Sequence, residues 1–144
     1  MFSIRPMSIA DYDPVIELMK KTPGLTLRDA DSRDNTARYL ERNPDLSFVA
    51  IVDSALVGCI MAGHDGRRGY LQHLLVLPGY RRQGIATSLV QRCIAGLEAA
   101  GIHKSHIDVL KTNVSGASYW TNRGWQLRTD ILRYSYVSSG DANA

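Results

Sequence analysis

The sequence predicts a mixed α/β fold (α+β), and two observations support this prediction. A buried strand over residues 70–77 leads through a short basic turn into a long helix, and another strand follows over 104–110. A strand, a long helix and a second strand form a right-handed crossover between parallel neighbours. Earlier in the chain, apolar runs at 46–52 and 56–62 flank a three-residue turn and predict an antiparallel hairpin.

The first third of the chain is predicted to hold one strand and two helices. Residues 3–7 are short and suit an edge strand. Asp13 and Pro14 provide an N-cap and a proline at the first helical position, and this helix ends at residues 22–24. A second helix, capped by Ser32, is expected to end at residue 42, just before an Asn-Pro pair.

Later elements follow from helical spacing and from glycines. Apolar residues repeat at helical spacing over 85–97, and Gly101 ends this helix. Three further elements are expected: a short helix at 115–123 capped by Gly124, and the two strands of a final hairpin at 125–128 and 132–137.

Length and composition fit one domain. The chain has 144 residues, 44% of them apolar, and we expect a single domain over 1–137 followed by a disordered tail at 138–144. No apolar run is long enough to span a bilayer and no signal peptide is apparent, so we expect a cytoplasmic protein with no membrane partner. Cys59 and Cys93 are expected to be buried, reduced thiols, and no metal is expected.

The net charge of +3 is unevenly distributed. Residues 67–111 hold seven Lys and Arg against two Asp and Glu, whereas residues 8–53 hold six against nine. An anionic cofactor on the first segment and a cationic amine near the second would each meet complementary potential, although ordinary solvated surface explains the same charges. No nucleic-acid partner is expected, because no basic stripe is interleaved with aromatic residues.

The junction after Pro78 has the composition of an anion site. The first backbone N–H groups of a helix have no partner inside it, and the helix dipole adds partial positive charge there. Arg81 and Arg82 add two cations, and Gly84 lets a phosphate approach the backbone without a side chain in the way. The sequence therefore predicts a pyrophosphate cradle at this turn.

The same turn carries a family motif. Residues 81–86, Arg-Arg-Gln-Gly-Ile-Ala, match Arg/Gln-x-x-Gly-x-Gly/Ala, and the chain thereby resembles the GCN5-related N-acetyltransferases, which bind the pyrophosphate of acetyl-CoA at this turn. Over residues 3–137 the resemblance implies a mixed central sheet of about six to seven strands with about four helices, in which parallel strands 4 and 5 splay around the pantetheine arm.

The resemblance implies acetyl-CoA (coenzyme A) as the cofactor. Backbone groups of Leu75, Val76 and Leu77 are expected to pair with the pantetheine arm, as an added strand would. The full set of expected cofactor-binding residues is Leu74, Leu75, Val76, Leu77, Arg81, Arg82, Gln83, Gly84, Ile85, Ala86, Thr87, Asn113 and Trp120.

Acylation of an amine requires a nitrogen lone pair, stabilisation of the charge that develops on the carbonyl oxygen, and a leaving group. A backbone N–H near Val76 is the candidate for the second requirement. His73, Asp108 and His64 are the candidate bases, and packing or surface hydrogen bonding is the alternative for each.

The C-terminal motif departs from the family pattern. Where the pattern places a tyrosine that protonates the departing thiolate, this chain has Trp120, whose indole N–H is no useful acid. Tyr119 lies one residue earlier, about 100° round the helix. We expect Trp120 to pack against the thiol end of the cofactor, with Tyr119 or water handling the proton.

The resemblance implies an N-acetyltransferase that acts on a primary amine, of a small molecule or a peptide N-terminus, by direct attack in a ternary complex. A non-catalytic acyl-CoA-binding sensor or partner module is the alternative. Asp29 and Asp31, in the loop where the family shapes its acceptor pocket, are candidates to hold an ammonium, with helix capping as the alternative. Dimers are common for this fold, which leaves a homodimer open.

Overall fold

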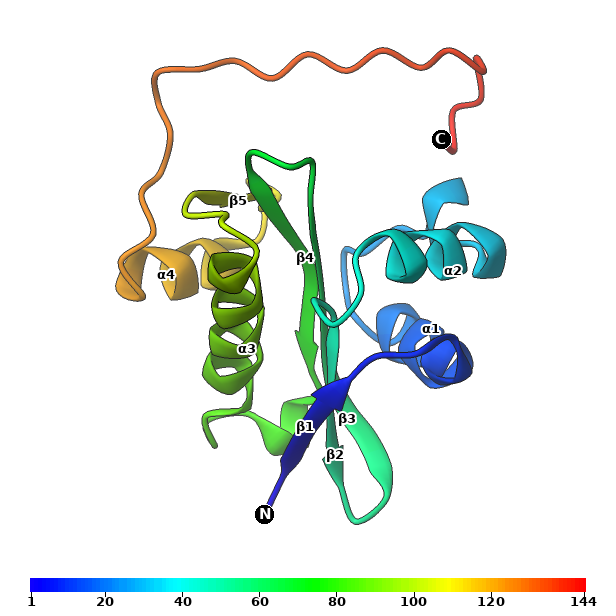
Figure 1. Cartoon of the computed structure of the whole chain (residues 1–144), viewed down its shortest axis with the longest axis vertical. Coiled ribbons are helices and arrows are strands. Elements are labelled where there is room, and N and C mark those ends of the chain that lie inside the picture. The colour runs from blue at the N-terminus through cyan, green and yellow to red at the C-terminus, as the bar shows by residue number, and fades with distance from the viewer. The chain divides into compact units, whose positions relative to one another are not determined.

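The computed structural model describes residues 1–144, which divide into two compact units: unit 1 (Met1–Ile107) and unit 2 (Asp108–Ala144). Unit 1 holds one sheet of five strands in the order β1-β2-β3-β4-β5 (Figure 1). The first four strands pair antiparallel and β5 lies parallel to β4, which confirms the predicted mixed α/β class. The strands are β1 (Ser3–Pro6), β2 (Phe48–Val52), β3 (Ala55–His64), β4 (Gly69–Val76) and β5 (Ser105–Ile107).

Four α-helices accompany the sheet along the chain, as expected. They are α1 (Tyr12–Lys20), α2 (Arg33–Arg42) and α3 (Ile85–Ala99) in unit 1 and α4 (Val114–Asn122) in unit 2. Three short 3₁₀ helices, which no sequence pattern predicted, occur at η1 (Ile9–Asp11), η2 (Asp29–Asp31) and η3 (Pro78–Tyr80). No helix of the structure has the length and apolar character that crossing a bilayer requires.

The helices of unit 1 cover both faces of the sheet. α3 packs on β2, β3 and β4 and lies on one side, whereas α1 and α2 lie on the other side (Figure 1). α3 turns its fully buried residues Ile85, Leu89, Cys93 and Leu97 inward, at the spacing that the sequence predicted. On the opposite face, Val15, Leu18 and Met19 of α1 join the buried cluster that includes Val49 and Cys59.

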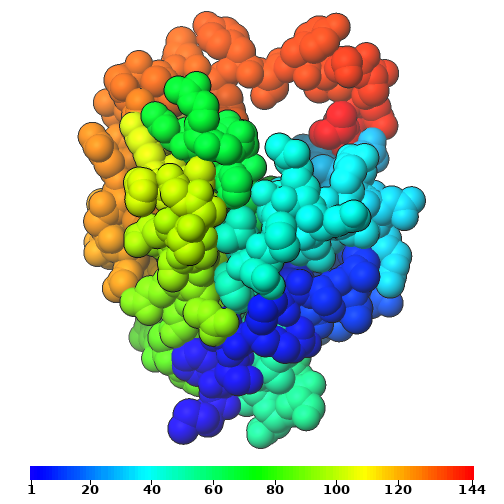
Figure 2. All heavy atoms as spheres, viewed as in Figure 1, coloured from blue at the N-terminus to red at the C-terminus, as the bar shows by residue number.

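The predicted hairpin of β2 and β3 is present. Asp53 and Ser54 adopt φ of 48° and 68°, the left-handed conformation that the tightest hairpin turns require. This turn is exposed and projects at the lower end of the molecule in Figure 2. Ser32 also caps α2 as predicted, because its side chain accepts a hydrogen bond from the Asn35 N–H.

Both cysteines are free and fully buried, as expected. Burial raises the pKa of the Cys59 thiol to about 12 and that of the Cys93 thiol to about 12. The thiols donate weak hydrogen bonds to backbone carbonyls, Cys59 to His73 at 3.4 Å and Cys93 to Leu46 at 3.2 Å. Neither thiol forms thiolate at neutral pH.

The expected number of strands was too high, because the sheet has five strands and the final hairpin is absent. Residues 125–137 form no strand, and Leu132, Tyr134 and Tyr136 are 80%, 88% and 92% exposed. Their alternation suits a strand, but a two-stranded hairpin is marginally stable without further packing. The expected extent of the domain, residues 1–137 with a tail at 138–144, stays a prediction.

Candidate active site at the β4 edge and the α3 N-terminus

β4 and β5 pair only at their beginnings. Gly69–Leu71 of β4 lie beside Ser105–Ile107 of β5, and β4 then continues to Val76 with β3 as its only partner strand. Residues 72–77 are correspondingly half-buried rather than buried. The parallel pairing therefore covers only three residues, because β5 ends at Ile107, and the splay implied by the resemblance stays a prediction.

The far end of β4 has one edge bonded to β3 and one edge turned away from it. The Leu77 N–H donates to the Val57 carbonyl at 2.9 Å, so this group is already used within the sheet. Backbone groups alternate between the two edges of a strand, and Val76 therefore directs its N–H and C=O to the other side. The Val76 carbonyl accepts a hydrogen bond from Arg81 Nε at 3.2 Å, which ties the basic turn to this edge.

The first turn of α3 has no cap from the protein. Gly84 is the N-cap, with φ of +84°, and provides no side-chain hydrogen bond. The N–H groups of Gly84, Ile85 and Ala86 donate to no backbone carbonyl, and the first helical bond runs from Ser88 N–H to the Gly84 carbonyl. A Cβ built at Gly84 would meet no atom within 4 Å. The helix therefore begins with backbone donors that have no backbone acceptor, beside a glycine with free space around it, which suits an anion site.

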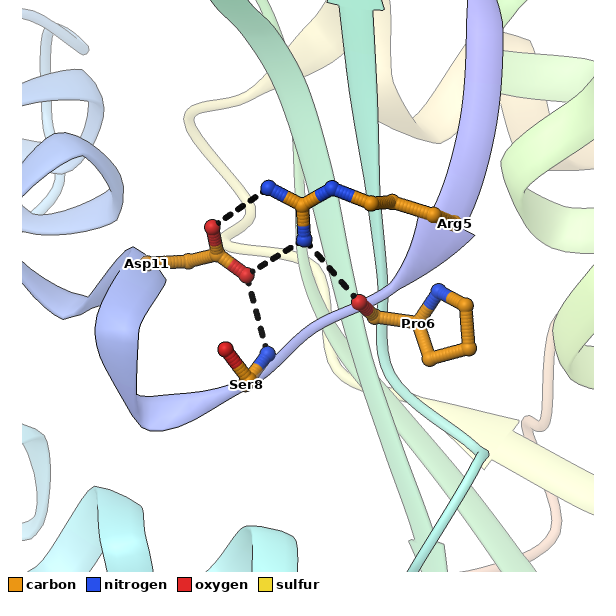
Figure 3. Close-up of polar contacts among 4 residues, drawn as sticks. All are labelled: Arg5, Pro6, Ser8 and Asp11. Carbon is orange, nitrogen blue, oxygen red and sulfur yellow. Dashed lines mark hydrogen bonds and ion pairs between the residues drawn. The ribbon is translucent and has the colours of Figure 1, made fainter.

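Arg81 and Arg82 flank these donors without a carboxylate partner. No ion pair of the structure includes either residue, and both are exposed. Arg5 behaves in the opposite way, because Asp11 accepts from its Nη1 and Nη2 at 2.8 and 2.7 Å (Figure 3). The guanidinium of Arg5 lowers the pKa of the Asp11 carboxyl, which also accepts a hydrogen bond from the Ser8 N–H. The protein satisfies Arg5 itself and leaves the charges of the α3 turn available.

His73 lies at an irregularity in β4. Cys59 pairs with Leu75 and Met61 pairs with Gln72, so His73 and Leu74 together oppose one residue of β3. His73 has φ of +53°, which is uncommon for a residue with a side chain. Such a β-bulge re-aims a side chain and is frequent beside active sites.

The His73 side chain meets a carboxylate from the loop before α2. His73 Nε2 lies 3.2 Å from Asp31 Oδ1, with side-chain exposures of 20% and 12%. Burial lowers the pKa of His73, and the nearby Asp31 raises it by a smaller amount, so that the pKa lies below its ordinary value. A half-buried imidazole that is neutral at pH 7 and held by a carboxylate suits a general base.

His64, another candidate base, ends β3 and is already engaged. His64 Nδ1 accepts a hydrogen bond from the Gly66 N–H at 2.9 Å. The His64 N–H in turn donates to the Asn43 side chain at 3.1 Å. These bonds hold the turn between β3 and β4 in place, a structural role that leaves His73 as the better-placed histidine.

Four of the predicted residues, Asp108, Asn113, Tyr119 and Trp120, belong to unit 2. Asn113 caps α4, because its side chain accepts from the Gly116 N–H at 2.9 Å. Trp120 is buried against two rings, with centroid distances of 5.2 Å to Tyr119 and 4.6 Å to Trp125. Asp108 is 57% exposed and lies 3.3 Å from Arg133. A carboxylate paired in this way is a weaker base candidate than His73.

A parallel strand pair that covers only three residues, beside a cationic and uncapped helix N-terminus, suits an acyltransferase that takes its acyl group from coenzyme A. Residues 12–125 match the acetyltransferase (GNAT) family, and the chain belongs to that family. The predicted family and the predicted enzyme class, an acyltransferase, are thereby confirmed. The family uses acetyl-CoA as its acyl donor, in agreement with the expected cofactor.

Relatives support this assignment along most of the chain. An acetyltransferase of Sodalis glossinidius is 33% identical over 129 residues, which are 90% of this chain and 90% of that protein. An acetyltransferase of Pectobacterium atrosepticum is 37% identical over 103 residues, which are 72% of each chain.

Solved structures share the fold. The PaiA N-acetyltransferase of Thermoplasma acidophilum, in complex with coenzyme A, has a TM-score of 0.78 and 21% identity, covering 89% of this chain and 91% of that one. AAC(6')-Iy, in complex with the bisubstrate analogue CoA-S-monomethyl-acetylneamine, has a TM-score of 0.75 and 20% identity, covering 95% and 99%.

Proposed function

We propose that this chain transfers the acetyl group of acetyl-CoA to a primary amine, of a small molecule or a peptide N-terminus, by direct attack in a ternary complex. The observation that carries the proposal is the uncapped N-terminus of α3 beside the edge of β4 that β5 leaves unpaired. Among the relatives in fold, AAC(6')-Iy is bound to an analogue that joins coenzyme A to an acetylated neamine, an amine-bearing acceptor.

The residues present fit a diphosphate. The N–H groups of Gly84, Ile85 and Ala86 donate to no backbone carbonyl, and no atom lies within 4 Å of the position that a Cβ of residue 84 would take. Arg82 and Arg81 bring positive charge that no carboxylate of the protein neutralises. Helix-terminal amides and guanidinium groups are the donors that phosphate oxygens accept best. These residues, with Gln83 and Thr87, would hold the pyrophosphate.

The open edge of β4 would hold the amide-bearing arm of the cofactor. An extended ligand pairs with strand groups that have no partner, and Val76 directs its N–H to that edge by alternation. The Leu77 N–H is bonded to Val57, which makes Val76 the better candidate of the two. The same N–H suits the stabilisation of negative charge on a carbonyl oxygen.

Acetyl-CoA, when bound, supplies an acetyl group activated as a thioester. The acceptor amine has to lose a proton in order to attack, and His73 accepts this proton. Burial keeps the imidazole neutral at pH 7, and the bulge of β4 directs it away from the regular register of the sheet. A thiol has a pKa near about 8.5, so the departing coenzyme needs no strong acid, and Tyr119 or water returns the proton.

A coupled binding and turnover experiment tests the proposal. Acetyl-CoA should raise the melting temperature of the protein. At an acetyl-CoA concentration of about 100 times the Kd, the free energy of unfolding rises by about 2.7 kcal/mol. Free thiol, measured over a panel of amines, polyamines, amino acids and peptides, should appear only when an acceptor is present. His73→Gln should reduce kcat by about 100-fold or more, since general-base catalysis contributes about 10²–10⁴-fold.

The two readouts separate the alternatives. Stabilisation by acetyl-CoA, with no free coenzyme A released in the presence of any amine, would favour the non-catalytic acyl-CoA-binding module. Absence of both effects would contradict the proposal altogether.

A further inference from the structure

We infer that Asp31 is a positioning residue, which holds the His73 imidazole with its proton on Nε2 and thereby leaves Nδ1 as the atom that removes the proton from the acceptor. The inference deepens the proposed function and rests on it. It replaces the expectation that Asp31 holds the acceptor ammonium directly.

The contact between the two side chains fixes the tautomer. His73 Nε2 lies 3.2 Å from Asp31 Oδ1, and an ionised carboxylate only accepts hydrogen bonds. A neutral imidazole has one N–H and one lone pair. Because Nε2 has to be the donor to Asp31, the lone pair of the neutral ring is on Nδ1. No hydrogen bond of the structure involves His73 Nδ1.

Asp31 is itself held firmly. Its other carboxylate oxygen, Oδ2, accepts from the Arg28 N–H at 2.8 Å, and its own N–H donates to the Arg28 carbonyl at 2.9 Å. The Tyr12 hydroxyl donates to the Asp31 carbonyl at 2.6 Å, which ties η2 to α1. One of these bonds holds the carboxylate and two hold the backbone of Asp31, so the side chain is fixed in a position from which it can orient a ring.

The backbone conformation of His73 also favours the contact between the imidazole and Asp31. The residue opposes β3 within a bulge and has φ of +53°, a strained conformation for a residue with a side chain. The protein tolerates this strain where the imidazole meets Asp31, from a loop 42 positions earlier in the chain. Strain of this kind is concentrated at functional sites.

Few charged or titratable groups face this pair. Asp31 approaches from η2, the Cys59 thiol of β3 contacts the His73 carbonyl, and Tyr12 of α1 contacts the Asp31 carbonyl. Burial raises the pKa of the Cys59 thiol to about 12, so this thiol stays protonated at neutral pH. The carboxylate favours the protonated imidazole, and its removal therefore lowers the pKa of His73 further.

Imidazole NMR on the full chain tests the inference without any acceptor. Long-range ¹H–¹⁵N correlation spectra give the tautomer and pKa of each histidine, and His73→Gln assigns the signals of residue 73. We expect the Nε2–H tautomer in the wild type, and in Asp31→Asn a lower pKa and loss of the tautomer preference. Asp34→Asn is the matched control, because it removes the same charge one turn further along, at an exposed site, and should change neither property.

Kinetics supply the second readout. Asp31→Asn should lower kcat by about tenfold or more and move the acid limb of the kcat profile to lower pH, with the KM for acetyl-CoA unchanged. Asp31→Glu should restore part of kcat. An Nδ1–H tautomer in the wild type, or a His73 pKa that Asp31→Asn leaves unchanged, would overturn the inference. Absence of acetyl transfer to every amine, with the expected spectra, would count against the proposed function alone.

Discussion

The two ends of α3 carry the same residue in the same conformation but differ in how their backbone groups are satisfied. Gly84 has φ of +84° and Gly101 has φ of +83°, and a Cβ at either position would meet no atom within 4 Å. At the C-terminal end, the Gly101 N–H donates to the Glu98 carbonyl and the Ile102 N–H to the Leu97 carbonyl, both at 2.9 Å. At the N-terminal end no such closure exists.

Packing explains the difference. Ile102, just after Gly101, is 3% exposed, so the chain leaves the helix there by folding an apolar residue back onto the core. Gly84 follows Arg82 and Gln83, which are exposed and polar and bury nothing. A glycine with a left-handed φ therefore closes a helix at one end and leaves the first N–H groups uncapped at the other. Local conformation alone does not distinguish these uses, whereas the fate of the neighbouring N–H groups does.

The strongest test of this comparison is a carboxylate placed at each end. Gly84→Asp should raise the Kd for coenzyme A by about 100-fold, because one charge-assisted interaction contributes about 1.5–3 kcal/mol and the new carboxylate repels phosphate. Isothermal titration calorimetry measures the change. Gly101→Asp, with matching φ and free space, should leave the Kd unaltered. An equal rise of the Kd in both variants would mean that strain in the helix, and not the proposed anion site, governs the affinity for coenzyme A.

A second test uses an arginine that the protein satisfies by itself. Asp11→Ala should lower the free energy of unfolding at pH 7 by about 2 kcal/mol, because it removes two hydrogen bonds to Arg5 and one to the Ser8 N–H. Urea unfolding measures this, and coenzyme A affinity should not change. A loss of affinity in a stably folded variant would show that the Arg5 site and the α3 turn are coupled.

The pH dependence of that variant has a defined sign. Arg5 lowers the pKa of Asp11, so the pair contributes stability above the unfolded-state pKa, near about 4, and loses it as the pH falls through the folded-state value. The difference between wild type and Asp11→Ala should therefore be full at pH 7 and shrink on acidification below about pH 4.

A smaller effect is expected at Arg82. Arg82→Ala should raise the Kd for coenzyme A by about tenfold and weaken its salt dependence, since an exposed guanidinium acts partly through a screened field. Arg92→Ala is the matched control, because Arg92 lies within α3, which this turn precedes, and its guanidinium lies 4.9 Å over the Phe48 ring. A Kd that rises equally in both variants would contradict a specific role for the turn.

The smallest expected effect is that of an alanine at either glycine, and it separates stability from coenzyme A binding. Gly101→Ala and Gly84→Ala should each lower the free energy of unfolding by about 1 kcal/mol, because both force a side chain into a left-handed conformation. Denaturant unfolding gives the values. Only Gly84→Ala should also weaken coenzyme A binding, and unaltered binding in that variant would place the phosphate away from Gly84.

The parts of the fold that depend on local chemistry were predictable from the sequence. α3, its glycines and the cap of α2 by Ser32 follow from helical spacing and capping rules, which act within a few residues. The turn at Arg81–Gly84 carries its motif in consecutive residues, so the family was recognisable, whereas the anion site at this turn stays a prediction.

The parts that depend on distant partners were not predictable. Nothing near His73 marks a bulge, because the register shift arises from its pairing with β3. The sequence suggested Asp31 as an ammonium ligand, and only the fold shows that it meets His73. The alternation at Leu132, Tyr134 and Tyr136 suggested a hairpin, which needs packing that a pattern does not report.

The complete burial of Cys59 and Cys93 has a practical consequence for enzymology. A colorimetric reagent that reacts with thiolates should detect the coenzyme released during turnover and no signal from the native polypeptide, because both protein thiols are inaccessible and hold their protons. In a control without acceptor, a slow reaction of two thiols per chain would then report unfolding of the protein. The same assay therefore follows both catalysis and the folded state of the enzyme.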